Sequence, residues 1–255
     1  MRKICRPFFA LLAVCLFTVL IPWSGFGAEV PFRSGEKLTF VVTWGAIPVG
    51  EGVLEVLPHT VVNGEAARRF SMTARTNTFA DIFYKVRDRM EGYTDMAMTQ
   101  SLHYTKLSEG RNKRNVAVPF DWNEERARYL HNGEQHASVD ILPGSFDPLS
   151  MFFVFRLFDL EVGKKLEVPV ADGKRVIQGH AVVLDREDIH VRGVDYDTFL
   201  VRVDMGDVDG VFMKSRDADL FIWVTADDRR MPVRMKSSVV VGNFMVELDR
   251  AEHID

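Results

Sequence analysis

Apolar and polar residues alternate along most of this chain with the period of two that is typical of half-buried strands. In the first clear example, Leu38, Phe40 and Trp44 fall on one face, while threonines occupy the other. The segment 220–225 is apolar on both faces, as expected of a strand inside a sheet. Alternation resumes over 233–248. The pattern therefore predicts a mainly β fold.

Turn signals between these segments indicate how the strands connect. Asn-Gly and Asp-Gly pairs favour the positive φ angles of two-residue turns, whose twist matches that of antiparallel strands. The chain contains three such pairs between candidate strands: Asn63-Gly64, Asn132-Gly133 and Asp172-Gly173. We therefore expect a curved antiparallel meander, either an open barrel or a half-barrel.

Two segments depart from the β pattern. Residues 78–84 suit one or two helical turns, and residues 147–160 suit a longer helix. Asp147 is a good N-cap, and Pro148 fits the first helical position. The body of the second segment is apolar nearly all round, which is typical of a buried helix. We expect the sheet to wrap over this helix as one β-rich domain, residues 28–255, with a possible joint at 143–146.

The N-terminal 27 residues have the pattern of a secretory signal peptide. Three basic residues precede an apolar run over 8–21, Pro22 ends that run, and glycines at 25 and 27 suit a signal peptidase. The run is shorter than a membrane span requires. This interpretation starts the mature chain near Ala28 and makes it periplasmic or secreted.

Cysteine and charge content follow from that division. Cys5 and Cys15 both lie in the leader, so the mature chain has no thiol or disulfide. Cys15 resembles a lipidation site, but the bulky Val14 and the continuing apolar run argue against it. Removing three basic residues and no acidic ones changes the formal charge from −4 to −7. An acidic average argues against nucleic acid or an anionic membrane as partner.

Known catalytic motifs are absent, so we predict no catalytic residue, no metal and no cofactor. Across the Asn132-Gly133 turn, His131, Glu134 and His136 share a face and could bind a metal, although an exposed polar hairpin tip explains them better. The acidic stretch 204–210 resembles a calcium loop, but its spacing fails. Carboxylate groups also cluster where turns are expected, and Asp favours turns; these are Asp185/Glu187/Asp188, Asp195/Asp197 and Asp227/Asp228.

Aromatic content is the strongest hint of a binding site. A well-filled core accounts for it, and so does an apolar cavity between sheet and helix that holds a lipid-like ligand. Arg156 is then either an anchor for the ligand's head group or, as we prefer, a surface-reaching arginine or the partner of a buried carboxylate. The candidate ligand-binding residues are Trp44, Phe152, Phe155, Arg156 and Trp223.

Four stretches together resemble a family of bacterial exported proteins, the domain-of-unknown-function family 3108. They are Phe-Arg-Ser-Gly-Glu-Lys-Leu-Thr-Phe at 32–40, Trp-Gly-Ala-Ile-Pro-Val-Gly at 44–50, Asp-Pro-Leu-Ser at 147–150 with Phe155-Arg156, and the run from Ile222 to Arg234 that contains Asp-Asp-Arg-Arg-Met-Pro-Val. The resemblance covers essentially the whole mature chain and implies no catalytic residues.

Three hypotheses remain. The first is a non-catalytic carrier of the cell envelope that binds an apolar or lipid-like ligand. The second is a structural or interaction protein of the envelope with a fully packed core, and envelope proteins as partners. The third is a hydrolase with an unfamiliar site. An apolar hollow favours the first, native-like packing throughout favours the second, and a concave cluster of perturbed titratable groups favours the third.

Overall fold

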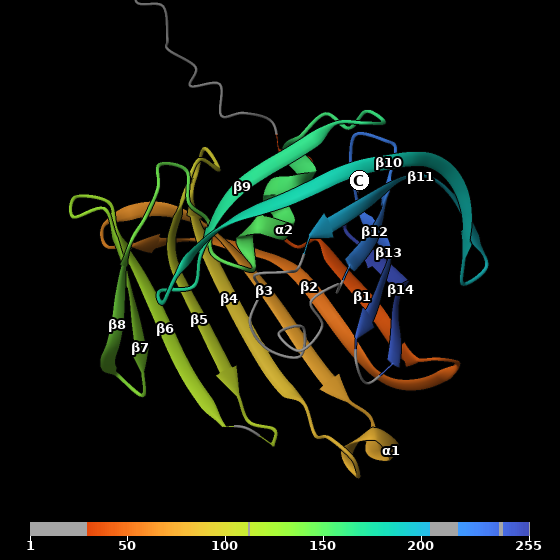
Figure 1. Cartoon of the computed structure of the whole chain (residues 1–255), viewed down its shortest axis with the longest axis horizontal. Helices are drawn as coiled ribbons and strands as arrows, with labels where there is room; N and C mark the ends of the chain where they lie inside the picture. The colour runs from red at the N-terminus through yellow and green to blue at the C-terminus, as the bar shows by residue number, and fades with distance from the viewer. Residues whose placement is uncertain (1–29, 112, 205–218, 240–241, 255) are drawn as a thin grey trace, which may run out of the picture.

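One antiparallel sheet of fourteen strands makes up most of the described chain (Figure 1). The computed structural model describes residues 30–111, 113–204, 219–239 and 242–254. The strand order is β8-β7-β6-β5-β4-β3-β2-β1-β14-β13-β12-β11-β10-β9. Strands that follow one another in the chain pair, except β8 and β9, and the strands β1 and β14 pair in the middle of the sheet. The edges β8 and β9 do not join, so the predicted open, curved meander is confirmed.

The strands vary from six to sixteen residues. The first eight are β1 (Lys37–Trp44), β2 (Ile47–Val62), β3 (Glu65–Thr76), β4 (Arg87–Asp95), β5 (Ser101–Ser108), β6 (Arg114–Asp121), β7 (Arg126–His131) and β8 (Glu134–Asp140). The other six are β9 (Lys165–Ala171), β10 (Val176–Val191), β11 (Val194–Asp204), β12 (Asp219–Thr225), β13 (Pro232–Val239) and β14 (Gly242–Glu252).

The Asn-Gly turns form as predicted. Asn63-Gly64 has φ angles of 51° and 88° between β2 and β3, and Asn132-Gly133 has 52° and 85° between β7 and β8. At the β9–β10 turn only Gly173 has a positive φ. A fourth turn, Arg192-Gly193, has the same positive angles, 48° and 92°. The sequence did not predict it, because arginine carries no turn signal.

Three short helical segments interrupt the strands: α1 (Thr78–Asp81), α2 (Ser150–Val154) and η1 (Phe155–Leu157). The helix predicted over 147–160 is thus shorter than expected. Asp147 does accept hydrogen bonds from the backbone N–H groups of Leu149 and Ser150, both 2.9 Å long. At the other end Phe158 is already extended, with ψ of 139°. The predicted turns at 78–84 begin with α1.

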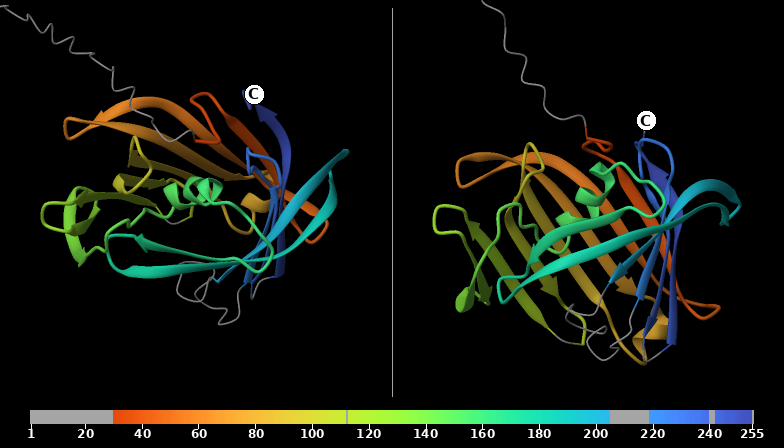
Figure 2. Two further views of the ribbon diagram at one scale, coloured as in Figure 1. Left: turned by 90° about the horizontal axis from the view of Figure 1, so that it is seen from above. Right: turned by 45° about the horizontal axis from the view of Figure 1, so that its top comes forward.

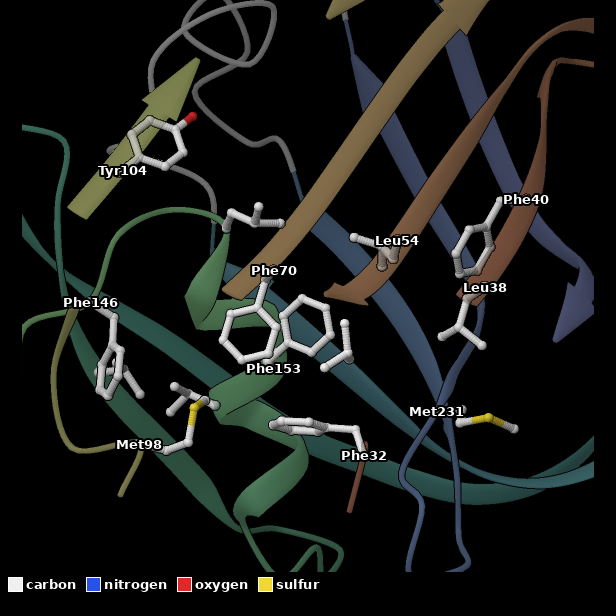
Figure 3. Packing of buried hydrophobic residues seen from close by; sticks show 14 of the residues in the cluster. Phe32, Leu38, Phe40, Leu54, Phe70, Met98, Tyr104, Phe146, Phe153 and Met231 are labelled. Carbon is white, nitrogen blue, oxygen red and sulfur yellow. The ribbon is translucent and has the colours of Figure 1, made fainter. Parts of the chain in front are cut away.

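The helix α2 lies inside the curve of the sheet, where it fills one end of the concave side (Figure 2). Phe153 of α2 stacks on Phe70 of β3, with ring centroids 4.1 Å apart, and Phe32 meets both rings edge to face (Figure 3). Each such pair stabilises the fold by about 0.5–1.5 kcal/mol beyond its buried area. This aromatic cluster couples the N-terminal segment, the sheet and the helix.

The segment 143–146, where the sequence suggested a joint, runs between the two halves of the sheet. Phe146 forms a parallel bridge with Val170 of β9, and the backbone N–H of Ser101 in β5 donates to the carbonyl of Ser145. Both Ser145 and Phe146 are buried. The connection from β8 to β9 is therefore packed against both halves.

Candidate functional site

The inward-facing side chains of β1 change from buried to exposed along the strand. Leu38 and Phe40, at the end near α2, are 1% and 2% exposed. Val42 is half-buried, and Trp44 is 43% exposed. The Trp44 indole lies over Gly242 of β14, where a Cβ atom would come within 2.4 Å of Nε1. The side chains on the concave face of β1 are thus less buried toward the end opposite α2.

Burial decreases in the same direction on neighbouring strands. On β14, Leu248 is buried, whereas Val246 and Phe244 are half-buried and pair with Val42 and Trp44 of β1. On β3 and β4, Phe70 and Gly92 form a buried pair. The next pair on the same face, Met72 and Met90, is half-buried. The half-buried apolar positions on this part of the concave face, which we call the open floor, are Val42, Met72, Met90, Met235, Phe244 and Val246.

Two glycines of β2, Gly50 and Gly52, pair with Val42 and Phe40 of β1 and carry no side chain. Gly52 pairs with Phe40 on one side and Ala74 on the other. A Cβ atom on Gly52 would meet nothing nearer than the Thr73 carbonyl at 3.8 Å, so the space before it is open. Gly50 differs, because its Cβ would lie 2.3 Å from the Arg75 carbonyl. Gly52 therefore leaves room beside the open floor.

Basic side chains line two neighbouring hollows at the β5–β8 side of the sheet, which we call the basic wall. The first, of about 570 Å³, is lined by Lys113, Arg114, Tyr129, His131, His136, Ala137 and Lys174. The second, of about 600 Å³, shares Lys113, Arg114 and His131 and extends to Lys85, Arg87 and the acidic Glu109. No carboxylate is among the described residues that line the first hollow. An anion is therefore the ligand that this wall favours.

The turn between β9 and β10 completes the first hollow. Gly173 approaches β6 and β7 so closely that a Cβ atom would lie 3.0 Å from both Val118 Cγ1 and the Tyr129 backbone nitrogen. This contact places the Lys174 ammonium 4.1 Å from the centroid of the Tyr129 ring. The glycine thus allows a cation from one half of the sheet to join the wall formed by the other half.

Arg156 pairs with a buried carboxylate, the interpretation preferred from the sequence over a ligand anchor. Its Nη1 and Nη2 lie 2.5 and 3.0 Å from the two carboxylate oxygens of Glu36, and both side chains are almost fully buried. Arg156 also donates to the carbonyls of Pro31 and Arg229. The motif segments at 32–40, 155–156 and 222–234 therefore meet at this pair, which explains them structurally.

The remaining aromatic candidates do not lie together in one site. Phe152 and Phe155 face the wall of β9–β12, where they pack against its buried side chains. Trp223 lies on β12, where it pairs with Leu200 of β11 and Arg234 of β13. Its Nε1 donates to Glu187 at 2.8 Å, and its ring faces the guanidinium of Arg234. The structure thus places Trp44 at the exposed end of the open floor and Trp223 apart from it.

Asp147, which precedes α2, is a fully buried carboxylate. It accepts a hydrogen bond of 2.6 Å from Ser101 Oγ, in addition to those from the helix backbone. Burial raises the pKa of Asp147, against the opposing effect of these hydrogen bonds. Gly92 makes room for the group, because a Cβ there would lie 2.9 Å from Asp147 Oδ1. Asp147 therefore caps and anchors the helix.

The acidic and histidine clusters noted in the sequence have local partners. Asp197 pairs with Arg186, and Asp227 with Arg229. Burial acts to raise the pKa of Asp227, but hydrogen bonds from Arg229 and Thr225 outweigh it and hold that pKa low. His131 and His136 lie 5.7 Å apart between ring centroids, and the described residues contain no group of three metal-ligating side chains. The 205–210 part of the acidic stretch and the N-terminal leader lie outside the described residues.

Sequence reasoning missed the basic wall. It considered His131 and His136 only as metal ligands and gave no role to Lys113, Arg114 and Lys174. The adjacent Lys113 and Arg114 were a visible signal, but Lys174 reaches them only through the fold. Within the described ranges no helix has the length and apolarity needed to cross a membrane.

Residues 39–249 match the family model described as "Protein of unknown function (DUF3108)". The chain belongs to this family. This confirms the resemblance noted in the sequence for nearly the whole sheet. No curated protein matches the sequence of this DUF3108 protein.

Two solved structures resemble this chain at low sequence identity. A β-barrel-like protein of the domain of unknown function DUF1849 from Brucella abortus superposes with a TM-score of 0.53 and 10% identity, covering 85% of this chain and 96% of its own. A Bacteroides fragilis protein described as exported and of YmcC-like fold gives a TM-score of 0.39 and 7% identity, covering 88% and 98%. Only the first likeness bears on the fold, and neither assigns a function.

Proposed function

We propose that this DUF3108 protein is a non-catalytic binding module of the cell envelope, exported by its N-terminal leader, that holds an anionic, lipid-like amphiphile on the concave face. The observation that carries the proposal is the change in burial along the inward-facing positions. Near α2 these positions are buried, whereas at the open floor the apolar side chains are partly exposed. Exposed apolar surface gathered on one concave face is typical of a ligand site.

The ligand's chemistry follows from what surrounds the floor. Methionines dominate it at Met72, Met90 and Met235, and their flexible thioethers adapt to chains of varied shape. The basic wall, on the same sheet, carries Lys113, Arg114 and Lys174 and attracts a carboxylate or phosphate. An amphiphile with one acyl chain and an anionic head satisfies both surfaces. Trp44 lies at the exposed end of the floor, while Phe152 and Phe155 pack against the wall of β9–β12 at the helix.

Binding of lysophosphatidylglycerol, a soluble single-chain anionic amphiphile, tests the proposal. Native mass spectrometry and isothermal titration calorimetry on the exported protein should detect a one-to-one complex. Lysophosphatidylcholine, with the same chain and a zwitterionic head, should bind more weakly. A reproducible bound mass that extracts as lipid from protein purified from its own periplasm supports the same conclusion. A protein that binds neither probe contradicts the proposal and favours a packed interaction module.

Two pairs of variants separate the floor from the wall. Gly52→Phe fills the open space and should abolish the complex, whereas Val53→Phe, at the next position on the opposite face of β2, should retain it. Lys113→Glu combined with Lys174→Glu should remove the preference for the anionic head, whereas Lys236→Glu on β13 should not. Circular dichroism and urea unfolding of each variant establish that it folds. Folded Gly52→Phe protein with unchanged affinity would exclude the open floor as the site.

A further inference from the structure

A cluster of apolar side chains stands in solvent at the end of the sheet opposite α2. Phe79, Ile82, Phe83 and Tyr84, which we call the aromatic knob, follow the end of β3. Ile82 is 77% exposed and Phe83 is 63% exposed. The rings of Phe79 and Phe83 meet edge to face at 5.6 Å. Side chains of this size gain nothing for the fold while they remain in water.

The local structure holds the knob in this exposed position. Asn77 Oδ1 accepts a hydrogen bond from the Ala80 N–H and caps α1, while Ala80 itself is buried. The Arg87 guanidinium makes two hydrogen bonds, of 3.1 and 2.6 Å, to the Asp81 carboxylate behind the knob. These hydrogen bonds hold the backbone of α1 in place while the apolar side chains of the knob remain exposed. Such exposed apolar patches mark interaction surfaces.

Basic residues flank the knob on the adjoining β5–β6 turn. The Arg111 backbone N–H donates to the Lys85 carbonyl, and the Arg111 guanidinium faces the Tyr84 ring at 5.8 Å. Segments 77–87 and 107–115 together carry five basic and two acidic residues, a net charge of +3. The whole chain has a net charge of −4. Positive charge is thus concentrated beside the knob in a protein that is acidic on average.

Further exposed apolar side chains lie at the same end. The Asn77 backbone N–H donates to the Val49 carbonyl, and Asn77 Nδ2 donates to the Pro48 carbonyl, so the start of β2 adjoins the knob. Trp44 and Ile47, on either side of the β1–β2 turn, are 43% and 48% exposed. Figure 1 shows α1 and this turn at the lower end of the sheet. Aromatic, aliphatic and basic side chains therefore share one end of the molecule.

We propose that this end of the protein docks on an anionic lipid bilayer, with the aromatic knob inserted at the headgroup level and Lys85, Arg111, Lys113 and Arg114 against the lipid phosphates. Aromatic side chains favour the membrane–water interface, and clustered lysines and arginines are attracted to anionic headgroups. The flanking charge distinguishes a bilayer from an apolar protein surface. This inference goes beyond the proposed function, although docking here would place the open floor close to the lipid.

Vesicle co-sedimentation of the full protein, purified after export, tests the docking. Vesicles of mixed phosphatidylglycerol and phosphatidylethanolamine should retain the protein at low salt, and vesicles of phosphatidylcholine should retain much less. Phe79→Ser combined with Phe83→Ser should weaken binding by roughly tenfold or more. Val61→Ser, which alters an equally exposed apolar side chain at the opposite end, should leave binding unchanged. Replacing Lys85 and Arg111, which do not line the first hollow, with glutamine should weaken it by roughly fivefold for each charge.

The proposal is overturned if the folded knob variant binds anionic vesicles as the wild type does. It is equally overturned if sedimentation velocity shows a dimer that dissociates in the knob variant while vesicles bind neither protein, because the knob would then join two copies of the chain. Gly52→Phe keeps the knob and should still dock. The knob variant keeps the open floor and should still bind lysophosphatidylglycerol. Failure of one proposal is thereby distinguishable from failure of the other.

Discussion

The buried ion pair between Arg156 and Glu36 joins the helical segment to the residue that precedes β1, and its contribution to stability can be tested by mutation. Arg156→Met removes the guanidinium but keeps most of the side chain's apolar length. Glu36 is only 3% exposed, so the change leaves a buried carboxylate without a cation. It also removes the donors to the carbonyls of Pro31 and Arg229. The perturbation is therefore electrostatic and concerns three acceptors at once.

The expected cost follows from these losses. Removing one partner of a buried ion pair destabilises a protein by about 3–5 kcal/mol, and each stranded acceptor adds about 1–3 kcal/mol. These contributions overlap, so we expect Arg156→Met to lower the free energy of unfolding by about 5 kcal/mol. A typical domain is stable by about 5–15 kcal/mol, so the variant is folded only marginally or not at all at 25 °C.

Urea unfolding followed by tryptophan fluorescence measures the effect. The midpoint should fall strongly, with the slope unchanged if only stability is altered. The double variant Glu36→Met/Arg156→Met no longer buries an unpaired charge and should recover about 3 kcal/mol relative to Arg156→Met alone. A single variant with the wild-type midpoint, or a double variant no more stable than the single, would refute the reasoning.

Three further outcomes can be measured by the same unfolding assay. Gly92→Ala should cost about 1–3 kcal/mol by overpacking, because its Cβ would lie 2.5 Å from Ser150 Oγ, whereas Gly52→Ala, with open space, should cost far less. Asn77→Ala removes the cap of α1 and should cost about 1 kcal/mol. Burial acts to raise the pKa of Glu91, but hydrogen bonds from Tyr93, Arg69 and Arg89 outweigh it and lower that pKa. Glu91→Gln should therefore cost about 2 kcal/mol at neutral pH, and the difference from wild type should vanish as the pH falls through and below about 4; a gap that persists in acid contradicts this assignment.

The sequence predicted those features of the fold that depend on neighbours along the chain. Alternation identified the strands, and Asn63-Gly64 and Asn132-Gly133 identified two turns, because side-chain direction and positive φ are local properties. The helix within 147–160 was recognised by its apolar surface, but its ends were not. They are decided by tertiary contacts, among them the hydrogen bond from Ser101 to Asp147, which local propensity does not contain.

Prediction of the candidate site was less complete for a related reason. Trp44 was identified because it continues the alternation of Leu38 and Phe40, so its face was known. The partner of Arg156 lies 120 residues earlier, and no local pattern marks Glu36 as that partner. The basic wall combines side chains from separate hairpins. Residues that meet only through the curvature of the sheet cannot be grouped from spacing alone.

The pairing of β1 with β14 has a consequence for how the chain reaches this structure. Thr43 of β1 donates to the carbonyl of Met245, 202 residues later. The middle of the sheet therefore cannot close until the residues of β14 have been synthesised, although each half can form hairpins earlier. Pairing over such separations is slow, because the loop must be closed before any contact stabilises it. A chain whose first strand pairs with its fourteenth therefore keeps two unpaired inner strand edges, one on each half, until the two halves meet.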